Sequence, residues 1–83
     1  MYYIYVLHCN DKKFYTGYTA NLKKRLTEHE NGEVTSTKNR FPVKLIYFEG
    51  SLNQKDALHR EKYLKTAWGK RYLKNRLKNY LTG

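Results

Sequence analysis

Two runs of apolar and aromatic residues near the N-terminus predict a β-hairpin. The first run is Tyr3-Ile4-Tyr5-Val6-Leu7, and the second, Phe14 to Thr19, has the same strand-forming character. Residues 10–13 lie between them and supply turn-forming side chains. The first run is apolar on both faces, a pattern typical of a strand at the centre of its sheet.

The residues after the second run follow a helical pattern. Leu22, Leu26 and His29 recur at spacings of four and three, and basic residues lie between them. Asn31-Gly32 is then expected to end the helix. A helix is therefore expected to follow the second strand directly.

The middle of the chain predicts a third strand and a second helix. The strand is expected over residues 43–49, and Gly50 ends it. Ser51 or Asn53 then caps the helix. One face of this helix collects residues at spacings of three and four, namely Ala57, Leu58, Glu61 and Leu64.

The C-terminal part predicts a last, basic helix. The pair Trp68-Gly69 is expected to break the helix before it. The residues expected to face inward from the last helix are Leu73, Leu77, Tyr80 and Leu81. The order β-β-α-β-α-α makes the chain a small α/β domain of the α+β type.

Composition indicates one domain over residues 1–83. The chain contains nine Tyr, three Phe and one Trp. These large rings can build a core that needs no metal ion or disulfide bond to stabilise it. The only cysteine, Cys9, cannot form an intramolecular disulfide, which indicates a reducing compartment. There is no long uncharged apolar stretch and no signal-peptide pattern. We expect a soluble cytoplasmic protein with no membrane partner and no obligate protein partner.

The charge predicts a polyanionic partner, since 17 Lys and Arg against seven Asp and Glu give a net charge of +10. The basic residues after Glu61, with no acid among them, are Lys62, Lys65, Lys70, Arg71, Lys74, Arg76 and Lys78. Nucleic acid is the expected partner, and Lys70, Arg71 and Lys74 are candidate contacts. Charge alone equally permits a solvated basic helix or an anionic membrane surface.

The polar loop of residues 31–41 also brings hydroxyls and cations together. Lys38 and Arg40 are its candidate contacts to a nucleic-acid phosphate. The same residue types fit an ordinary surface connection, which is the commoner case.

The hairpin and the helix after it bring phenols and a guanidinium together. Tyr5 and Tyr15 lie on neighbouring strands, and Arg25 lies on the following helix. Two hydroxyls and a planar cation suit a phosphodiester. Strand tyrosines are more often core aromatics, and helix arginines more often face solvent. Tyr3 shares a strand face with Tyr5, so its ring is expected beside the same site.

These residues resemble the GIY-YIG nuclease domain, and most closely its small stand-alone bacterial members. Tyr3-Ile4-Tyr5 stands at the first motif of that family, Tyr15-Thr16-Gly17 at the second, and residues 22–29 at the helix that carries the family arginine. The resemblance covers nearly the whole chain and implies a three-stranded antiparallel sheet flanked by helices. Two residues depart from the motifs: Tyr3 replaces a glycine and Thr16 an isoleucine.

The resemblance implies metal-dependent hydrolysis. Tyr5 would position phosphate or water, and Tyr15 would be the base that activates water. Arg25 would neutralise the charge that grows on the phosphate oxygens. One divalent ion, Mg²⁺ or Mn²⁺, would bind Glu61. Because an ordinary phenol has a pKa near 10, Tyr15 would need a neighbour that lowers its pKa or relays its proton.

Glu61 has a second interpretation. It lies within the apolar stripe of its helix, where a carboxylate needs a cation to balance it. A structural ion pair with Arg25 or Arg60 would meet that need as well as a metal would. Mg²⁺ can be held by one carboxylate together with the substrate phosphate, and the resemblance favours this choice.

Two further residues are candidates for the site. His29 lies one helical turn beyond Arg25, where it could contact phosphate, act as an alternative base or cap the helix end. Asn75 is the candidate for an asparagine that the family carries in its last segment, although Asn79 competes and an exposed amide is the simpler interpretation.

The sequence therefore predicts a divalent-metal-dependent endonuclease that hydrolyses phosphodiester bonds of DNA in repair or recombination. The alternative is a catalytically inactive nucleic-acid-binding domain, which the departures at Tyr3 and Thr16 motivate. A protein–protein module that works through its aromatics is a third possibility. The residues do not distinguish DNA from RNA.

Overall fold

Three antiparallel strands form one sheet in the order β2-β1-β3. The computed structural model describes all 83 residues. The strands are β1 (Tyr2–His8), β2 (Phe14–Thr19) and β3 (Lys44–Ser51). Their register pairs Tyr5 with Gly17 on one side and with Phe48 on the other. The expectation that the first apolar run is the central strand is confirmed.

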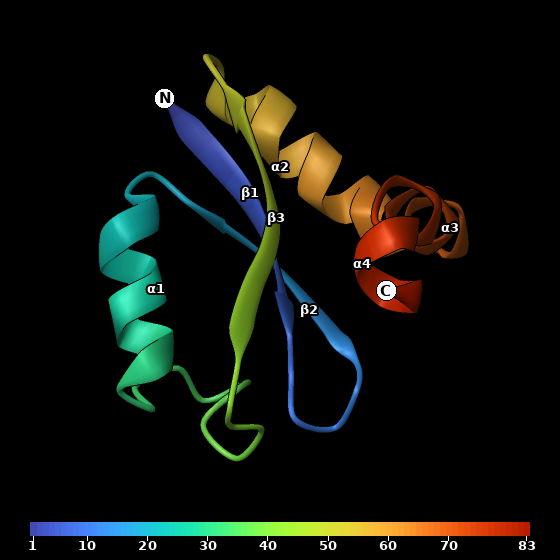
Figure 1. Cartoon of the computed structure of the whole chain (residues 1–83). Coiled ribbons are helices and arrows are strands. Elements are labelled where there is room, and N and C mark those ends of the chain that lie inside the picture. The colour runs from blue at the N-terminus through green and yellow to red at the C-terminus, as the bar shows by residue number, and fades with distance from the viewer.

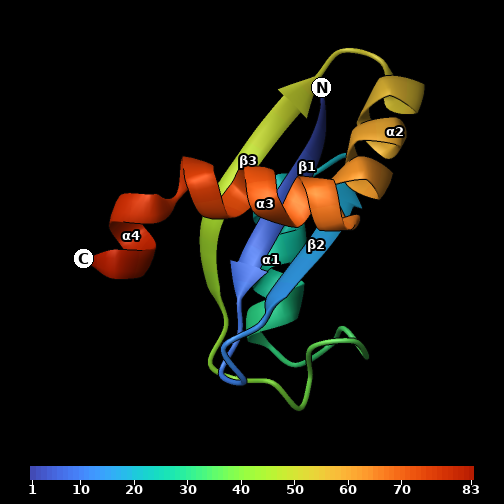
Figure 2. The same ribbon diagram turned by 90° about the vertical axis from the view of Figure 1, so that its right-hand side faces the viewer.

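Helices cover both faces of this sheet. They are α1 (Leu22–Glu30), α2 (Gln54–Leu64), α3 (Ala67–Arg76) and the short α4 (Lys78–Thr82). Figure 1 shows α1 on one side of the strands and α2 with α3 on the other. Figure 2 shows α3 running across the strands. The predicted α+β class and the order β-β-α-β-α-α are confirmed, with α4 as an addition at the C-terminus. None of the helices has the length and apolarity that crossing a bilayer requires.

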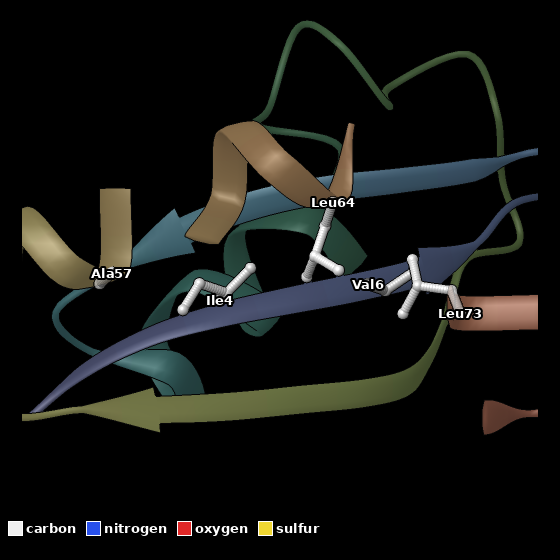
Figure 3. Packing of buried hydrophobic residues seen from close by; sticks show 5 residues of the cluster. All are labelled: Ile4, Val6, Ala57, Leu64 and Leu73. Atoms are coloured by element: carbon white, nitrogen blue, oxygen red, sulfur yellow. The ribbon is translucent and has the colours of Figure 1, made fainter. Parts of the chain in front are cut away.

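The alternation of side chains along β1 divides the core in two. Ile4 and Val6 face α2 and α3, where they pack against Ala57, Leu64 and Leu73 (Figure 3). Tyr5 and Leu7 face α1, where the partly buried residues packed around them include Leu22, Leu26 and Leu45. Because each half buries its apolar surface against a different helix layer, β1 fixes the helices of both faces relative to one another.

The boundary between α2 and α3 differs from the sequence prediction. Trp68-Gly69 does not break a helix but lies in the first turn of α3, and the break falls at Lys65 and Thr66. The hydroxyl of Thr66 caps α3 by accepting from the backbone N–H of Gly69 at 3.1 Å. Gly69 is buried against the last turn of α2, so its missing side chain serves close packing rather than helix termination.

The end of the chain also differs from the prediction. The expected single helix is divided at Leu77 into α3 and α4. Leu73 is buried and Leu77 is half-buried, whereas Tyr80 and Leu81 are exposed rather than inward. Elsewhere β3 continues through Gly50, and Asn53 is the residue that caps α2.

The tight contact at Gly69 gives a stability prediction. In an unobstructed helix, Gly→Ala is stabilising by about 1 kcal/mol. In Gly69→Ala the new Cβ would overlap the carbonyl oxygen of Tyr63 and the Cα of Leu64. We expect the free energy of unfolding to fall by about 1–3 kcal/mol, measured by chemical denaturation.

Gly50→Ala is the matched control, because the closest atom to its new Cβ is the sulfur of the flexible Met1 side chain. A Gly69→Ala variant as stable as Gly50→Ala would show that α2 and α3 are not packed as described.

Candidate active site

The Tyr5 side chain is the centre of the candidate site. Its ring is buried and lies over Gly17, its partner on β2. A Cβ at position 17 would overlap the phenol ring and its hydroxyl oxygen. Gly17 therefore makes room for the Tyr5 hydroxyl at the outer strand of the sheet. This explains in physical terms why a glycine belongs in the second motif.

Two side chains of α1 bind the Tyr5 hydroxyl. Arg25 Nε donates to the phenol oxygen at 3.4 Å, and His29 Nε2 lies 2.8 Å from the same oxygen. The two residues are four positions apart and so lie on one face of the helix. Asn21 begins this helix by accepting from the backbone N–H of Lys24. The sequence placed Arg25 and His29 together, and the structure brings both to Tyr5.

Thr37 completes this cluster and was missed by the sequence prediction. Its Oγ1 lies 2.7 Å from His29 Nδ1, and both residues are buried. A buried imidazole needs a hydrogen-bond partner at each ring nitrogen. This requirement, together with the hydroxyl-rich loop that follows α1, could have indicated a threonine or serine partner for His29. Because the phenol oxygen already accepts from Arg25, its own proton is free to point at His29 Nε2. In the tautomer that this arrangement favours, His29 Nδ1–H donates to Thr37 Oγ1.

Burial and charge set the protonation of this pair. Burial, with smaller contributions from the Tyr15 and Glu61 charges, raises the pKa of Tyr5 to about 12 against the opposing effect of Arg25. Burial, and then the positive charge of Arg25, lowers the pKa of His29 below its ordinary value. At neutral pH the phenol therefore holds its proton, and the imidazole is neutral, with the lone pair of Nε2 available to accept the phenol O–H.

Tyr15 stands beside this pair with its hydroxyl free. Its ring centroid is 6.3 Å from that of Tyr5 and 5.3 Å from that of His29. The ring is half-buried, and its hydroxyl has no hydrogen-bond partner within the chain. Tyr15 can therefore offer its O–H to a ligand, but no group of the protein is in place to accept its proton.

Glu61 is the only carboxylate whose charge acts on the pKa of Tyr5, which it raises. Its side chain is 20% exposed and pairs with Lys65 Nζ at 3.2 Å. The ion pair expected as an alternative, with Arg25 or Arg60, is not formed, because Arg25 pairs with Glu28 and Arg60 pairs with a glutamate of β3. Lys65 is the more exposed partner, so a ligand could displace it at small cost.

A single carboxylate is the donor set available to a metal here. No group of three or more His, Cys, Asp or Glu side chains could hold an ion in this chain. Mg²⁺ keeps several waters and can be bound through one carboxylate and a substrate phosphate, so Glu61 fits this kind of site.

The remaining predicted residues lie apart from Tyr5. Asn75 is exposed on α3, where it lines an open groove with Ala67, Lys70, Arg71 and Lys74. The structure therefore does not bring Asn75 to the site. Lys38 is exposed in its loop. Arg40 is held by Asp11 through bonds of 2.8 and 3.3 Å, so its guanidinium ties the loop to the hairpin.

The two departures from the family motifs have separate locations. The Tyr3 ring packs edge-on against Phe48 at 6.4 Å between centroids and borders a shallow groove with Leu22 and Leu26. Thr16 is buried on the opposite face of the sheet, towards α2 and α3. Neither side chain is a partner of the Tyr5 hydroxyl.

Comparisons with known proteins show to which family the chain is similar. Residues 1–76 match the GIY-YIG catalytic domain. The chain is 48% identical over 66 residues to the UPF0213 protein CPE1444 of Clostridium perfringens, covering 78% of this chain and 71% of that one. It is 44% identical over 80 residues to the UPF0213 protein in the ldhD 5'region of Pediococcus acidilactici, covering 89% and 82%.

A solved structure is similar as well. The solution NMR structure of the UPF0213 protein BH0048 from Bacillus halodurans has a TM-score of 0.56 and 30% identity, and the match covers 88% of this chain and 82% of that chain. The family match over residues 1–76 contains β1, β2, α1, β3, α2 and α3, and with them every residue of the candidate site, including Thr37 in the loop between α1 and β3. The chain belongs to the GIY-YIG catalytic domain family, a family of nucleases.

Proposed function

We propose that this protein is a divalent-metal-dependent endonuclease that hydrolyses phosphodiester bonds of DNA. The observation that carries the proposal is the buried Tyr5 hydroxyl, held between Arg25 and His29, with Thr37 behind the imidazole. A planar cation beside a phenol and a neutral imidazole suits an anion that must be attacked by water. The net charge of +10 suits a nucleic-acid substrate.

Tyr5 and His29 would share the task of removing a proton from the attacking water. A phenol with a pKa of about 12 is a poor base alone. If its proton moves along the hydrogen bond to His29 Nε2 as the water gives its proton to the phenol oxygen, no free phenolate has to form. This pair would take the role of base that the sequence analysis gave to Tyr15, because no group of the protein is placed to accept the Tyr15 proton.

The other groups would act on the phosphate. Arg25 has its Nε on the Tyr5 oxygen and would place its guanidinium against a non-bridging phosphate oxygen. The free hydroxyl of Tyr15 would donate to the same group. Glu61 would hold one Mg²⁺ or Mn²⁺, an ion that when bound supplies positive charge for the scissile phosphate and the leaving oxygen.

A nucleic-acid-binding domain without activity is the second candidate. The observation that favours it is that Lys65 already neutralises Glu61 in the free protein. We prefer the enzyme because the Tyr5 cluster is a chain of polar contacts that binding alone does not need. We further propose a role in DNA repair or recombination in the cytoplasm, where the single free Cys9 would stay reduced.

The Glu61→Gln variant tests the enzyme directly. Cleavage should be measured with Mg²⁺ and with Mn²⁺ on branched, flapped, single-stranded and duplex DNA. We expect the rate to fall by about a hundredfold or more, because the change keeps the shape and removes the anionic ligand. Stability should change by at most about 1 kcal/mol, since the pair with the exposed Lys65 contributes little.

Glu30→Gln is the control, because it removes the same charge from an exposed position on α1. Loss of cleavage in both variants would point to general electrostatics rather than a metal ligand. Wild-type protein that binds these DNAs but cuts none of them would support the binding domain instead.

The protonation of His29 predicts a pH dependence of stability. Its pKa is lowered in the folded state, so the unfolded chain binds more protons as pH falls. The stabilising contribution of neutral His29 is complete above about pH 6.5, its unfolded pKa, and is lost as pH falls through the folded value. We expect denaturation midpoints to fall with acidification from about pH 6.5, well before carboxylates titrate near pH 4.

Two carboxylates, Asp11 and Glu49, lose their stabilising contributions at a lower pH than His29 does. A hydrogen bond from Arg40 lowers the pKa of Asp11, and for Glu49 burial is outweighed by hydrogen bonds from Arg60 and Tyr47. Their contributions are therefore retained while His29 titrates. If midpoints stay constant down to about pH 5, His29 is not buried in its neutral form.

A further inference from the structure

Trp68 is a large aromatic side chain that belongs to neither half of the hydrophobic core. It is the only tryptophan and is 67% exposed in the first turn of α3. The guanidinium of Arg71, one turn further along, lies 5.1 Å from the centre of the indole ring. Arg71 has no acidic partner, and no acid occurs after Glu61. An open aromatic face next to an unpaired cation is suited to stacking a nucleobase.

A basic groove lies beside Trp68 on α3, and Arg71 belongs to its lining. Its lining consists of Ala67, Lys70, Arg71, Lys74 and Asn75. Lys70 also lines a second hollow, at the outer edge of β2, where Tyr15 and Lys65 are among the lining residues. Lys70 thus joins the groove on α3 to the candidate active site. The cations that line the two hollows suit a strand whose phosphates pass from Tyr15 towards Trp68.

Other partners fit this surface less well. The buried side of α3 is used in the core through Gly69 and Leu73, and the exposed side carries mostly Lys, Arg and Asn, so α3 has no continuous apolar face towards solvent. Insertion of a helix into a membrane interface needs such a face. A groove in which Ala67 is the only hydrophobic residue also offers no apolar anchor for a peptide.

We propose that Trp68 and Arg71 form a base-stacking site for an unpaired nucleotide and that a single strand crosses Lys70 to reach the active site. This inference rests on the proposed function in one respect, that the site at Tyr5 and Tyr15 acts on nucleic acid. The substrate is then a nucleic acid that is unpaired on the α3 side of the scissile bond. Duplex bases are stacked on one another and cannot reach the indole.

Intrinsic fluorescence tests the proposal, because Trp68 is the only tryptophan of the chain. The titration uses the Glu61→Gln variant without metal, so that binding is separated from cleavage. The probes are single-stranded oligothymidylate, an abasic phosphodiester oligomer of equal length and a blunt duplex. We expect oligothymidylate to quench the emission, and the abasic oligomer and the duplex to bind without comparable quenching.

Substitutions of Trp68 measure how much its ring contributes to the affinity for single-stranded DNA. Trp68→Ala, followed by fluorescence anisotropy of labelled DNA, should weaken oligothymidylate binding about 5- to 140-fold and leave the affinity for the abasic oligomer unchanged. Trp68→Phe should retain most of the affinity. Phe48→Ala, which removes an exposed ring of β3 (53% exposed), should leave both affinities unchanged.

Two results with DNA would overturn the stacking site. One is equal loss of affinity for both oligomers in Trp68→Ala, and the other is tight oligothymidylate binding with unchanged emission. A blue shift on anionic vesicles without any response to DNA would also overturn it, in favour of a membrane surface. The nuclease is tested separately, since quenching in a protein that never cuts DNA with Mg²⁺ or Mn²⁺ would keep the stacking site and refute the endonuclease.

Discussion

The structure depends on the contact between the Tyr5 ring and Gly17. The pairing of β1 with β2 places these residues opposite each other, and the absent side chain at position 17 admits the phenol. The hydroxyl is thereby carried to the outer part of the sheet, where Arg25 and His29 reach it from α1. One close approach between neighbouring strands thus determines where the polar groups of the site can meet.

The position of α2 is fixed by a second set of interactions on the far side of the sheet. Arg60 forms two-pronged hydrogen bonds with Glu49 of β3, at 2.9 Å for the closest pairs, and lies against the rings of Tyr63 and Tyr72. Because Glu61 follows Arg60 directly, this clamp also holds the carboxylate proposed to bind the metal. Charged groups outside the proposed site thus position one of its members.

Much of the fold follows from local pattern. The alternation along β1 and the spacing of Leu22, Leu26 and His29 indicate the two core layers and the face of α1. The role of Gly69 does not follow, because it depends on the close approach of α2, and a glycine in sequence equally suggests a helix break. Thr37 was missed for a similar reason: its partnership with His29 spans a loop whose path no local pattern specifies.

The central claim is that the Tyr5 hydroxyl takes part in catalysis, and Tyr5→Phe tests it most directly. The variant keeps the ring over Gly17 and removes only the atom that joins Arg25 to His29. Single-turnover cleavage with Mg²⁺ should slow by roughly 10²- to 10⁴-fold, while Tyr3→Phe, changed on the same strand face, should cut at the wild-type rate. A folded Tyr5→Phe protein that cleaves DNA as fast as the wild type would contradict the account.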